Sequence, residues 1–434
     1  MNRRIARSFL LLGALFAGDK LLAMVRQVLI GRTFGVGSQL DAFNAANNLP
    51  DLVFALISGG AMAVAVIPVL TETLDREGRD SAWALFSRLA NWAFLITAVL
   101  AAGLALFAQP FIAHVVVPNF DTAHQALTAS LMRLDLFALL IFSVSGLVMG
   151  SLQALKHFLL PGLAPILYNC GLIVGVVVLV PRYGIYGLAY GTILGAGLHL
   201  AIQLPALVAF GFHWTPSLDW RTPGVLKAAK LMAPRILTVA AIQTIFVATD
   251  NFASGLGTGA ITALAYGWLI MQVPETVIGS ALGTVLLPTL SELADRGALD
   301  ELRRMIRRAS AITLALTLPV LAVGIPLMGP AVRLVFAGRA FTAEGAAMVA
   351  ATASIFFIGL PAHALIETAA RAFYARQDAR TPLWTAVWTA AAFLGLCFVL
   401  TPILGYRGVA VANILAYSSE AVLLFGLLRI RGMI

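Results

Sequence analysis

Apolar runs long enough to cross a lipid bilayer recur along this 434-residue chain. A spanning helix needs about 20 consecutive apolar residues, and inside a bilayer every backbone polar group must be bonded internally. Only 11% of the residues are charged, whereas soluble domains carry about 25%. So few charges cannot cover a water-facing surface, which excludes a soluble enzyme. The sequence predicts an all-α polytopic membrane protein.

A window of about 19 residues finds twelve expected transmembrane helices. They are centred in residues 8–31, 41–70, 84–110, 128–153, 159–180, 185–210, 228–254, 260–290, 309–328, 345–372, 383–401 and 408–429. Charges interrupt the first run and no cleavage site follows a compact apolar core, so we expect no cleaved signal peptide.

The basic residues predict the orientation. The side that would hold both termini carries 20 of the 29 lysines and arginines. The opposite side carries Arg32, Arg182, Arg333, Arg339 and Arg407. Since cytoplasmic loops are rich in lysine and arginine, both termini are predicted to be cytoplasmic, and the net charge of +9 indicates topology rather than a nucleic-acid partner. The polar stretch Ser291–Arg308 is expected to be a surface helix on the anionic leaflet.

The two halves of the sequence resemble each other at a spacing of 220 to 221 residues. The matching pairs are Gly59–Glu72 with Gly279–Glu292, Leu152–Pro161 with Phe373–Pro382, and Tyr183–Leu194 with Leu404–Leu415. Six helices per repeat is an even number, so both repeats enter the membrane from the same face. We expect two six-helix lobes, residues 1–215 and 216–434, as parallel pseudo-repeats around a central cavity, an arrangement typical of transporters.

The first helix carries three charged residues at membrane depth, Asp19, Lys20 and Arg26. Asp19 and Arg26 share a helix face, and Lys20 points about 100° away. The excess positive charge favours a cavity wall that binds an anionic substrate. The alternative is that Asp19 pairs with Arg26 while Lys20 extends to the interface.

Other charged residues have competing interpretations. Asp41 begins the second helix, where helix capping explains it as well as function does. Asp250 is a candidate cation ligand. We expect Arg133 and Asp135 to be explained by local pairing and by extension to the interface.

Several polar positions in the helices point to packing. Glu367 and Arg371 are expected to pair at i,i+4, and Pro274 predicts a bend. Glu420 and His199 have no partner that the sequence identifies, so we expect both to be buried in the protein interior.

No catalytic constellation is present in the sequence. The six histidines lack metal-ligand spacing, and there is no Walker A, G-x-S-x-G or HExxH motif. We therefore expect no enzyme activity, no catalytic residues, no metal and no cofactor. Any transport would draw on an ion gradient, the membrane potential or the substrate gradient.

Three segments carry a family resemblance: Arg26–Leu70, Ile278–Glu292 and Arg371–Pro382. They are similar to the MurJ (MviN) family, the lipid II flippases of the MOP transporter superfamily. The resemblance implies a monomer in the bacterial cytoplasmic membrane, in contact with membrane lipids. It would translocate a lipid-linked anionic substrate, the undecaprenyl-diphosphate-linked peptidoglycan precursor, by alternating access. This activity would serve peptidoglycan synthesis, cell wall biogenesis and cell shape.

The resemblance also implies site residues. Arginines of the family hold the diphosphate in the central cavity. By motif, Arg26 and Asp41 match the residues that the family has at these positions, and Lys20 stands where an arginine is usual. The other two arginine positions are Phe54 and Leu269 here.

The family's cation site retains Asp250, whereas its polar positions on the eleventh helix are Phe393 and Cys397. Members usually continue for two further helices. Two alternatives stay open: an exporter of another lipid-linked or amphiphilic substrate in the same fold, and a non-transporting scaffold of envelope synthesis.

Overall fold

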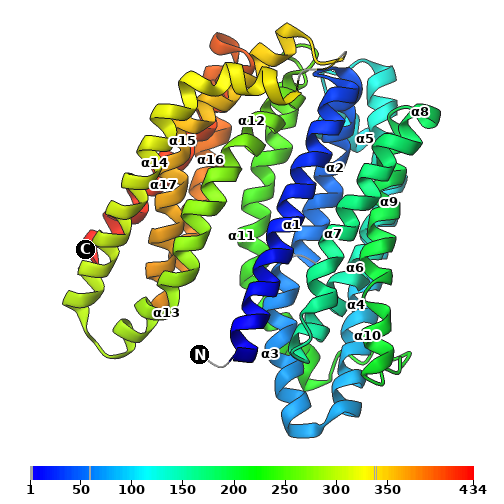
Figure 1. The fold of residues 1–434 in the computed structure, drawn as a ribbon, viewed down its shortest axis with the longest axis vertical. Helices are drawn as coiled ribbons and strands as arrows, with labels where there is room; N and C mark the ends of the chain where they lie inside the picture. Colours follow the sequence, from blue (N-terminus) through cyan, green and yellow to red (C-terminus); the bar gives the residue numbers. More distant parts are fainter. Residues whose placement is uncertain (1–2, 58–59, 337, 339) are drawn as a thin grey trace. The chain divides into compact units, whose positions relative to one another are not determined.

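The computed structural model describes residues 3–57, 60–336, 338 and 340–434. Arg339 therefore lies outside the described residues. In the described part the secondary structure is helical, with no strand (Figure 1). Ten helices there are long and apolar enough to cross a membrane. The protein is thus an all-α integral membrane protein, and the number of twelve spans stays a prediction.

Chain contacts divide the protein into two compact units. The first comprises residues 1–34, 45–115 and 120–240. Its helices, with α11 continuing into the second unit, are α1 (Arg3–Phe34), α2 (Ser38–Ile57), α3 (Gly60–Glu77), α4 (Arg79–Leu106), α5 (Ala108–Phe111), α6 (Thr122–Ala154), α7 (Leu159–Val174), α8 (Val180–Tyr183), α9 (Tyr186–Ala201), α10 (Leu204–Ala209) and α11 (Pro223–Ala253). Two π-helical turns, η1 (Ile112–Val116) and η2 (Gly175–Leu179), follow α5 and α7.

The second unit comprises residues 35–44, 116–119 and 241–434. The start of α2 therefore belongs to this unit. The unit's other helical elements after α11 are α12 (Ala260–Glu275), η3 (Thr276–Ser280), α13 (Ala281–Asp295), α14 (Leu299–Phe336), α15 (Ala343–Ala375), α16 (Arg380–Leu404) and α17 (Tyr406–Ile430). The boundary predicted between residues 215 and 216 stays a prediction.

Each of the twelve apolar runs corresponds to helix in the described residues, and five of them are divided: 41–70, 84–110, 159–180, 185–210 and 260–290. The run 41–70 corresponds to α2 and α3, with residues 58 and 59 between them outside the described residues. The run 260–290 changes to the π-helical turn η3 directly after Pro274 and Glu275. Pro274 removes a backbone donor just before this change, and the bend predicted at the proline stays a prediction.

The expected surface helix Ser291–Arg308 is wrong. Gly297, in the left-handed region at φ 67°, ends α13, and α14 then runs without a break from Leu299 to Phe336. Leu302 and Ile306 of the basic segment are fully buried against α13, α15 and α17. The apolar side of this segment therefore packs against the unit's own core.

The structure repeats at the spacing found in the sequence. Each end of α15 lies 221 positions after the corresponding end of α6, and both helices begin with a side-chain cap, from Asp121 and Thr342. The two non-glycine residues with positive φ in the described chain, Lys156 at 60° and Gln377 at 57°, are also 221 apart. Such a conformation is unfavourable for both side chains. Its recurrence supports the repeat independently of residue identity.

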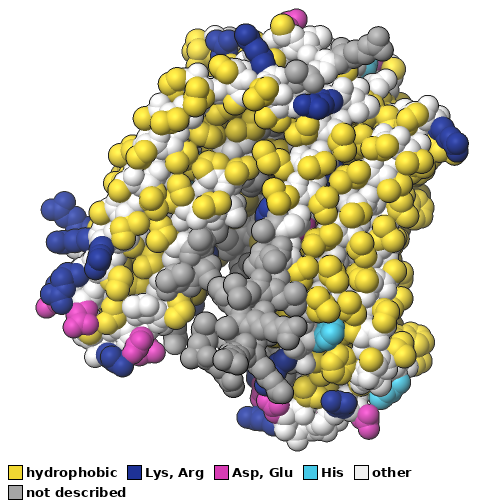
Figure 2. Space-filling model, viewed as in Figure 1, with side chains coloured by type: hydrophobic (Ala, Val, Ile, Leu, Met, Phe, Trp, Pro, Cys, Tyr) yellow, Lys and Arg dark blue, Asp and Glu magenta, His cyan; other side chains and the backbone are white. Residues whose placement is uncertain are grey.

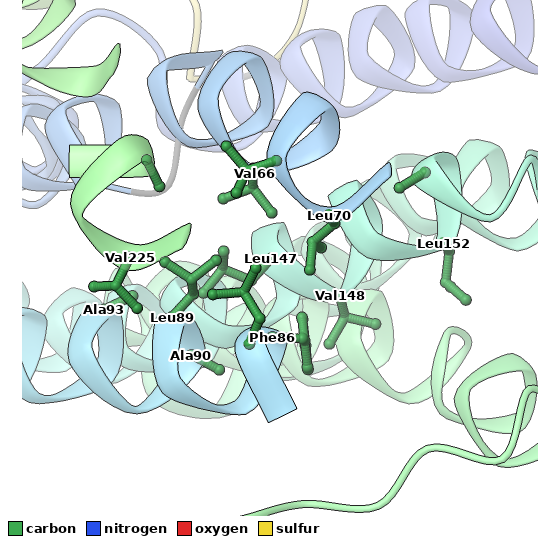
Figure 3. Close-up of a cluster of buried hydrophobic side chains, with 14 of the residues drawn as sticks. Val66, Leu70, Phe86, Leu89, Ala90, Ala93, Leu147, Val148, Leu152 and Val225 are labelled. Atoms are coloured by element: carbon green, nitrogen blue, oxygen red, sulfur yellow. The ribbon is translucent and has the colours of Figure 1, made fainter. Parts of the chain in front are cut away.

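A cluster of buried aliphatic and aromatic side chains forms the core of the first unit. It joins α3, α4, α6 and the start of α11, and Figure 3 shows Val66, Phe86, Leu147 and Val225 among its members. Because lipid tails are as apolar as these side chains, the cluster stabilises the unit chiefly through close packing. The helix sides exposed in Figure 2 are mostly hydrophobic, with most charged side chains near the helix ends, as a bilayer requires.

Glycines set the spacing between α7 and α9, which pack side by side (Figure 1). A Cβ added to Gly171 would lie 2.3 Å from Cα of Gly195, and one added to Gly175 would lie 2.7 Å from Cα of Gly191. No side chain fits in these gaps. Small residues four positions apart are the usual means of bringing membrane helices close together.

Candidate functional site

The cation predicted to bind substrate, Arg26, is held by a helix that the sequence did not pair with it. Arg26 of α1 donates from Nη1 to Oδ1 of Asn169 on α7 at 2.8 Å. Asn169 donates in turn from Nδ2 to Oδ1 of Asp19 at 2.8 Å. The buried amide, 3% exposed, therefore connects the two charges of α1. Sequence reasoning missed Asn169; its one signal is an amide inside an otherwise apolar run.

Lys20, the neighbouring cation, is exposed. Within the described part of the chain, no hydrogen bond or ion pair involves its ammonium group. A lysine on a four-carbon stem can reach an anion over several ångströms. Lys20 is thus available to a ligand, whereas Arg26 is positioned by Asn169.

Asp41 lies in α2, and its side chain caps the start of a different helix, α12. The carboxylate, 1% exposed, accepts hydrogen bonds from the backbone N–H groups of Gly259 at 2.5 Å and Thr262 at 2.7 Å, and from the Thr262 hydroxyl at 2.6 Å. These N–H groups belong to the start of α12, which otherwise lacks a side-chain cap. A carboxylate there also favours the positive end of the helix dipole. The part of Asp41 in substrate binding stays a prediction.

Asp250 lies buried near the end of α11. The two positions of α16 where the resemblance implies polar residues, Phe393 and Cys397, are fully buried and apolar. Within the described residues no group of three or more histidine, cysteine, aspartate or glutamate side chains could hold a metal ion. A cation role for Asp250 stays a prediction.

The first unit also contains a cavity of about 330 Å³ with two carboxylates in its wall, Asp51 of α2 and Asp135 of α6. The expected local pairing of Arg133 with Asp135 is wrong. Arg133 is exposed and donates to the carbonyl of Ala105 at 3.0 Å, while Asp135 is buried. Residues two apart on a helix point to different sides, which explains the difference.

Histidine and phenylalanine side chains also line this cavity. His199 of α9, whose burial the sequence predicted, contacts Ser145 through Nδ1 at 2.6 Å. Phe54, at one of the implied arginine positions, packs edge-on against Phe142 with ring centroids 5.4 Å apart. An aromatic side chain therefore occupies that position of the cavity wall.

A second cavity, of about 200 Å³, lies in the second unit. Glu420 lines it and accepts hydrogen bonds from Thr385 at 3.1 Å and Thr389 at 2.7 Å, so the structure supplies the partners that the sequence did not identify. Glu367 also lines it, and the predicted pair with Arg371 is confirmed at 2.8 Å. Each of these two carboxylates has donors from the protein.

Comparison with known proteins identifies the family. A family model described as Lipid II flippase MurJ matches residues 30–434. The chain belongs to the MurJ family. The Burkholderia cenocepacia Lipid II flippase MurJ is 29% identical, over 96% of this chain and 82% of the relative. The Rhizobium meliloti Probable lipid II flippase MurJ is 29% identical, over 99% of this chain and 81% of the relative.

Solved structures agree with this MurJ assignment. The structure titled Lipid II flippase MurJ, inward closed conformation, has a TM-score of 0.85 at 22% identity, covering 98% of this chain and 89% of that one. An inward-facing multidrug resistance MATE family transporter of the MOP superfamily has a TM-score of 0.79 at 14% identity, covering 95% and 94%. This MurJ-family chain therefore has the fold of the MOP superfamily. It is a membrane transporter and not an enzyme.

Proposed function

We propose that this protein is a lipid II flippase, moving the undecaprenyl-diphosphate-linked precursor of peptidoglycan to the outer leaflet of the bacterial cytoplasmic membrane. The match of the family model over residues 30–434 carries the proposal. The protein works by alternating access between two lobes, residues 1–215 and 216–434. It acts as a monomer surrounded by membrane lipids, with both termini in the cytoplasm.

Lys20 and Arg26 bind the diphosphate in this proposal. A diphosphate away from bulk water needs fixed cations, and a guanidinium binds phosphate oxygens in a fork. Two observations support this assignment. Lys20 is exposed. Arg26 is oriented by the amide of Asn169, which also donates to Asp19. Asp41 positions the start of α12, and Asp250 is the candidate coupling residue.

Complementation of a bacterium depleted of its own flippase tests the proposal. Wild-type protein restores growth. Lys20→Ala and Arg26→Ala each lower transport by roughly 10- to 100-fold, because a charge-assisted hydrogen bond contributes about 1.5–3 kcal/mol. Lys20→Arg retains activity. Lys230→Ala, at an exposed lysine of α11, is the matched control and leaves growth unchanged.

If the protein reaches the membrane at the level of a functional flippase and growth is still not restored, the result contradicts lipid II as the substrate. Full activity of both alanine variants contradicts the roles of Lys20 and Arg26. Labelling of single cysteines placed at the two ends tests the orientation, since both ends should react only from the cytoplasmic side.

A second candidate is an exporter of another amphiphile in the same fold. Phe54 and Leu269 favour it, because both are uncharged where the family resemblance implies arginines. Competition binding in nanodiscs distinguishes the two functions. Polyprenyl diphosphate lipids should displace lipid II far better than single-chain anionic lipids do, and equal displacement would favour the second candidate.

A further inference from the structure

The cavity of the first unit holds a carboxylate for which the described structure provides no donor. Asp135 is 2% exposed and lines the cavity of about 330 Å³. Neither of its carboxylate oxygens has a hydrogen-bond partner among the described residues. An ionised carboxylate without a partner in an apolar interior costs several kcal/mol. Such a group is stable only when a proton or a cation neutralises it.

A second carboxylate increases the negative charge of the same cavity. Asp51 of α2 lines the wall together with Asp135, and the two carboxylates act on each other electrostatically. Their neighbours in the wall include the apolar side chains of Phe54, Phe142 and Leu139. Asp51 is exposed whereas Asp135 is buried, so the negative charge of Asp51 adds to the cost of ionising Asp135 without a counter-charge.

The protein's own cations do not fill this role. Arg133, on the same helix as Asp135, is exposed and bonded to the Ala105 carbonyl. The positive charge of Arg26 interacts electrostatically with Asp51, and its guanidinium also donates a hydrogen bond to Asn169. One guanidinium is too little charge to balance both Asp51 and Asp135. The remaining titratable groups that line the cavity are Tyr168 and His199.

His199 is held by two polar side chains of the first unit, Ser145 and Gln203. Gln203 donates from Nε2 to Oγ of Ser145 at 3.1 Å and lies 3.3 Å from Nδ1 of His199, while the Ser145 hydroxyl lies 2.6 Å from that nitrogen. Nδ1 is therefore occupied by Ser145 and Gln203, and neither oxygen of Asp135 receives a hydrogen bond from the imidazole. His199 does not pair with Asp135.

We propose that Asp51 and Asp135 bind one monovalent cation, a proton or Na⁺, from solution inside the first unit. Carboxylate oxygens are suitable ligands for a hard cation, and either ion gives the cavity the charge that its wall lacks. The site is separate from Asp250. It goes beyond the proposed function, because cation binding here does not depend on which lipid is carried.

Thermal unfolding of the full-length protein in nanodiscs tests cation binding without any transport measurement. A ligand that binds only the folded protein raises the unfolding midpoint. Replacing choline chloride by NaCl at constant ionic strength should raise the midpoint at fixed pH if Na⁺ binds. If the proton binds, the midpoint rises as the pH falls from 8 to 5 and is insensitive to Na⁺. Insensitivity to both ions overturns the proposal.

Matched variants locate the response. Asp135→Asn and Asp51→Asn should each raise the half-saturating concentration of the bound ion, Na⁺ or the proton, at least tenfold. Asp75→Asn, at an exposed carboxylate of α3, and His199→Gln should retain it. An infrared band of a protonated carboxyl group that disappears in Asp135→Asn identifies the proton directly. A response that survives both cavity variants, or is lost in His199→Gln alone, overturns the proposal.

Discussion

Asn169 shows how one neutral side chain can organise two charges inside a membrane protein. Its amide accepts from Arg26 and donates to Asp19, so each charge has a hydrogen bond although no ion pair joins them. An Asn has both a donor and an acceptor, which aspartate, leucine or alanine at this position would not provide. The orientation of Arg26 toward a phosphate therefore depends on residue 169.

Replacing that amide should cost both stability and transport. Asn169→Ala removes two hydrogen bonds and leaves charged partners unsatisfied, so we expect a loss of about 1–3 kcal/mol in the free energy of unfolding. Transport in the complementation assay should fall as far as in Arg26→Ala. Cys170→Ala, the next residue on α7, is the control and should change neither. Wild-type transport by Asn169→Ala would show that Arg26 is not positioned by this contact.

Single-residue features were predicted unevenly from the sequence. Helical spacing placed Asp19 and Arg26 on one face, and the i,i+4 pair Glu367–Arg371 was predicted because both partners share a helix. Asn169 was missed because it lies 143 residues from Arg26. The pairing expected for Asp135 failed because side chains two positions apart diverge.

At the level of elements, α7 and α9 depend on the absence of side chains between them. Gly171 and Gly175 on one helix face Gly191 and Gly195 on the other, and backbone atoms occupy the positions that a Cβ would need. In a bilayer, where lipid tails are as apolar as the protein, this close packing replaces the hydrophobic effect as the attraction between helices.

A methyl group at that contact should separate the helices. Gly171→Ala places Cβ 2.3 Å from Cα of Gly195, so the backbones must move apart at a cost of about 1–3 kcal/mol. Gly197→Ala is the matched control, since nothing lies within 4 Å of its Cβ. Alanine favours a helix over glycine by about 1 kcal/mol, so this control should be neutral or stabilising. Equal unfolding temperatures for the two variants would contradict the packing argument.

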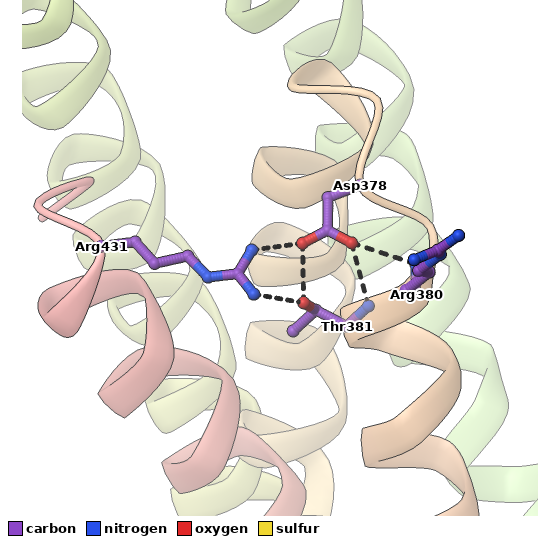
Figure 4. Close-up of polar contacts among 4 residues, drawn as sticks. All are labelled: Asp378, Arg380, Thr381 and Arg431. Atoms are coloured by element: carbon purple, nitrogen blue, oxygen red, sulfur yellow. Dashed lines mark hydrogen bonds and ion pairs between the residues drawn. The ribbon is translucent and has the colours of Figure 1, made fainter.

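The segment between α15 and α16 belongs to one of the three segments that resemble the MurJ family. Asp378 accepts from the backbone N–H groups of Arg380 and Thr381, both at 3.0 Å, and from the Thr381 hydroxyl at 2.6 Å. Arg431, just after α17, pairs with the same carboxylate (Figure 4). The motif therefore caps α16 and ties α17 to it, which is a structural role.

Acid should weaken this connection. Although desolvation opposes ionisation, the hydrogen bonds from Thr381 and the pairing with Arg431 lower the pKa of Asp378 from 3.8 to about 2. A carboxyl with a lowered folded-state pKa stabilises the fold above its unfolded pKa and loses that contribution as the pH falls toward 2. At pH 6 the free energy of unfolding of the wild type should exceed that of Asp378→Asn by about 1 kcal/mol, a value reduced by solvent screening. This difference should shrink below pH 4. A difference in unfolding temperature that is independent of pH would contradict this.

The expectation of helices succeeded because a bilayer permits few other structures, and twelve apolar runs sufficed to locate them. The joints between helices were less predictable. Gly297 ends α13 within a stretch that reads as one amphipathic helix, and Leu302 packs inward where lipid contact was expected.

Across the whole molecule, the chain order and the compact units do not coincide. Residues 35–44 come from the first sequence repeat, yet they belong to the second unit, where Asp41 caps α12. Added Cβ atoms on Gly259 and Gly345 would also meet Val36, which shows how closely this segment packs there. Each sequence half is therefore incomplete without residues of the other.

Splitting the chain tests this interdependence. Fragments 1–215 and 216–434 should be recovered from membranes together and should be degraded when expressed singly. Asp41→Ala removes the cap of α12 at a cost of about 1–2 kcal/mol, so copurification should fall at least fivefold. Asp121→Ala, which removes a cap inside the first fragment, should leave copurification intact. Stable accumulation of 216–434 alone would contradict this expectation.

The shared backbone bend at Lys156 and Gln377 has an evolutionary consequence. Two unrelated side chains adopt the same unfavourable geometry at equivalent places. An ancestral duplication that copied the shape and afterwards let the chemistry diverge accounts for this pattern. Distantly related proteins that share this duplication are then better recognised by the positions of their backbone turns than by the residue types found there.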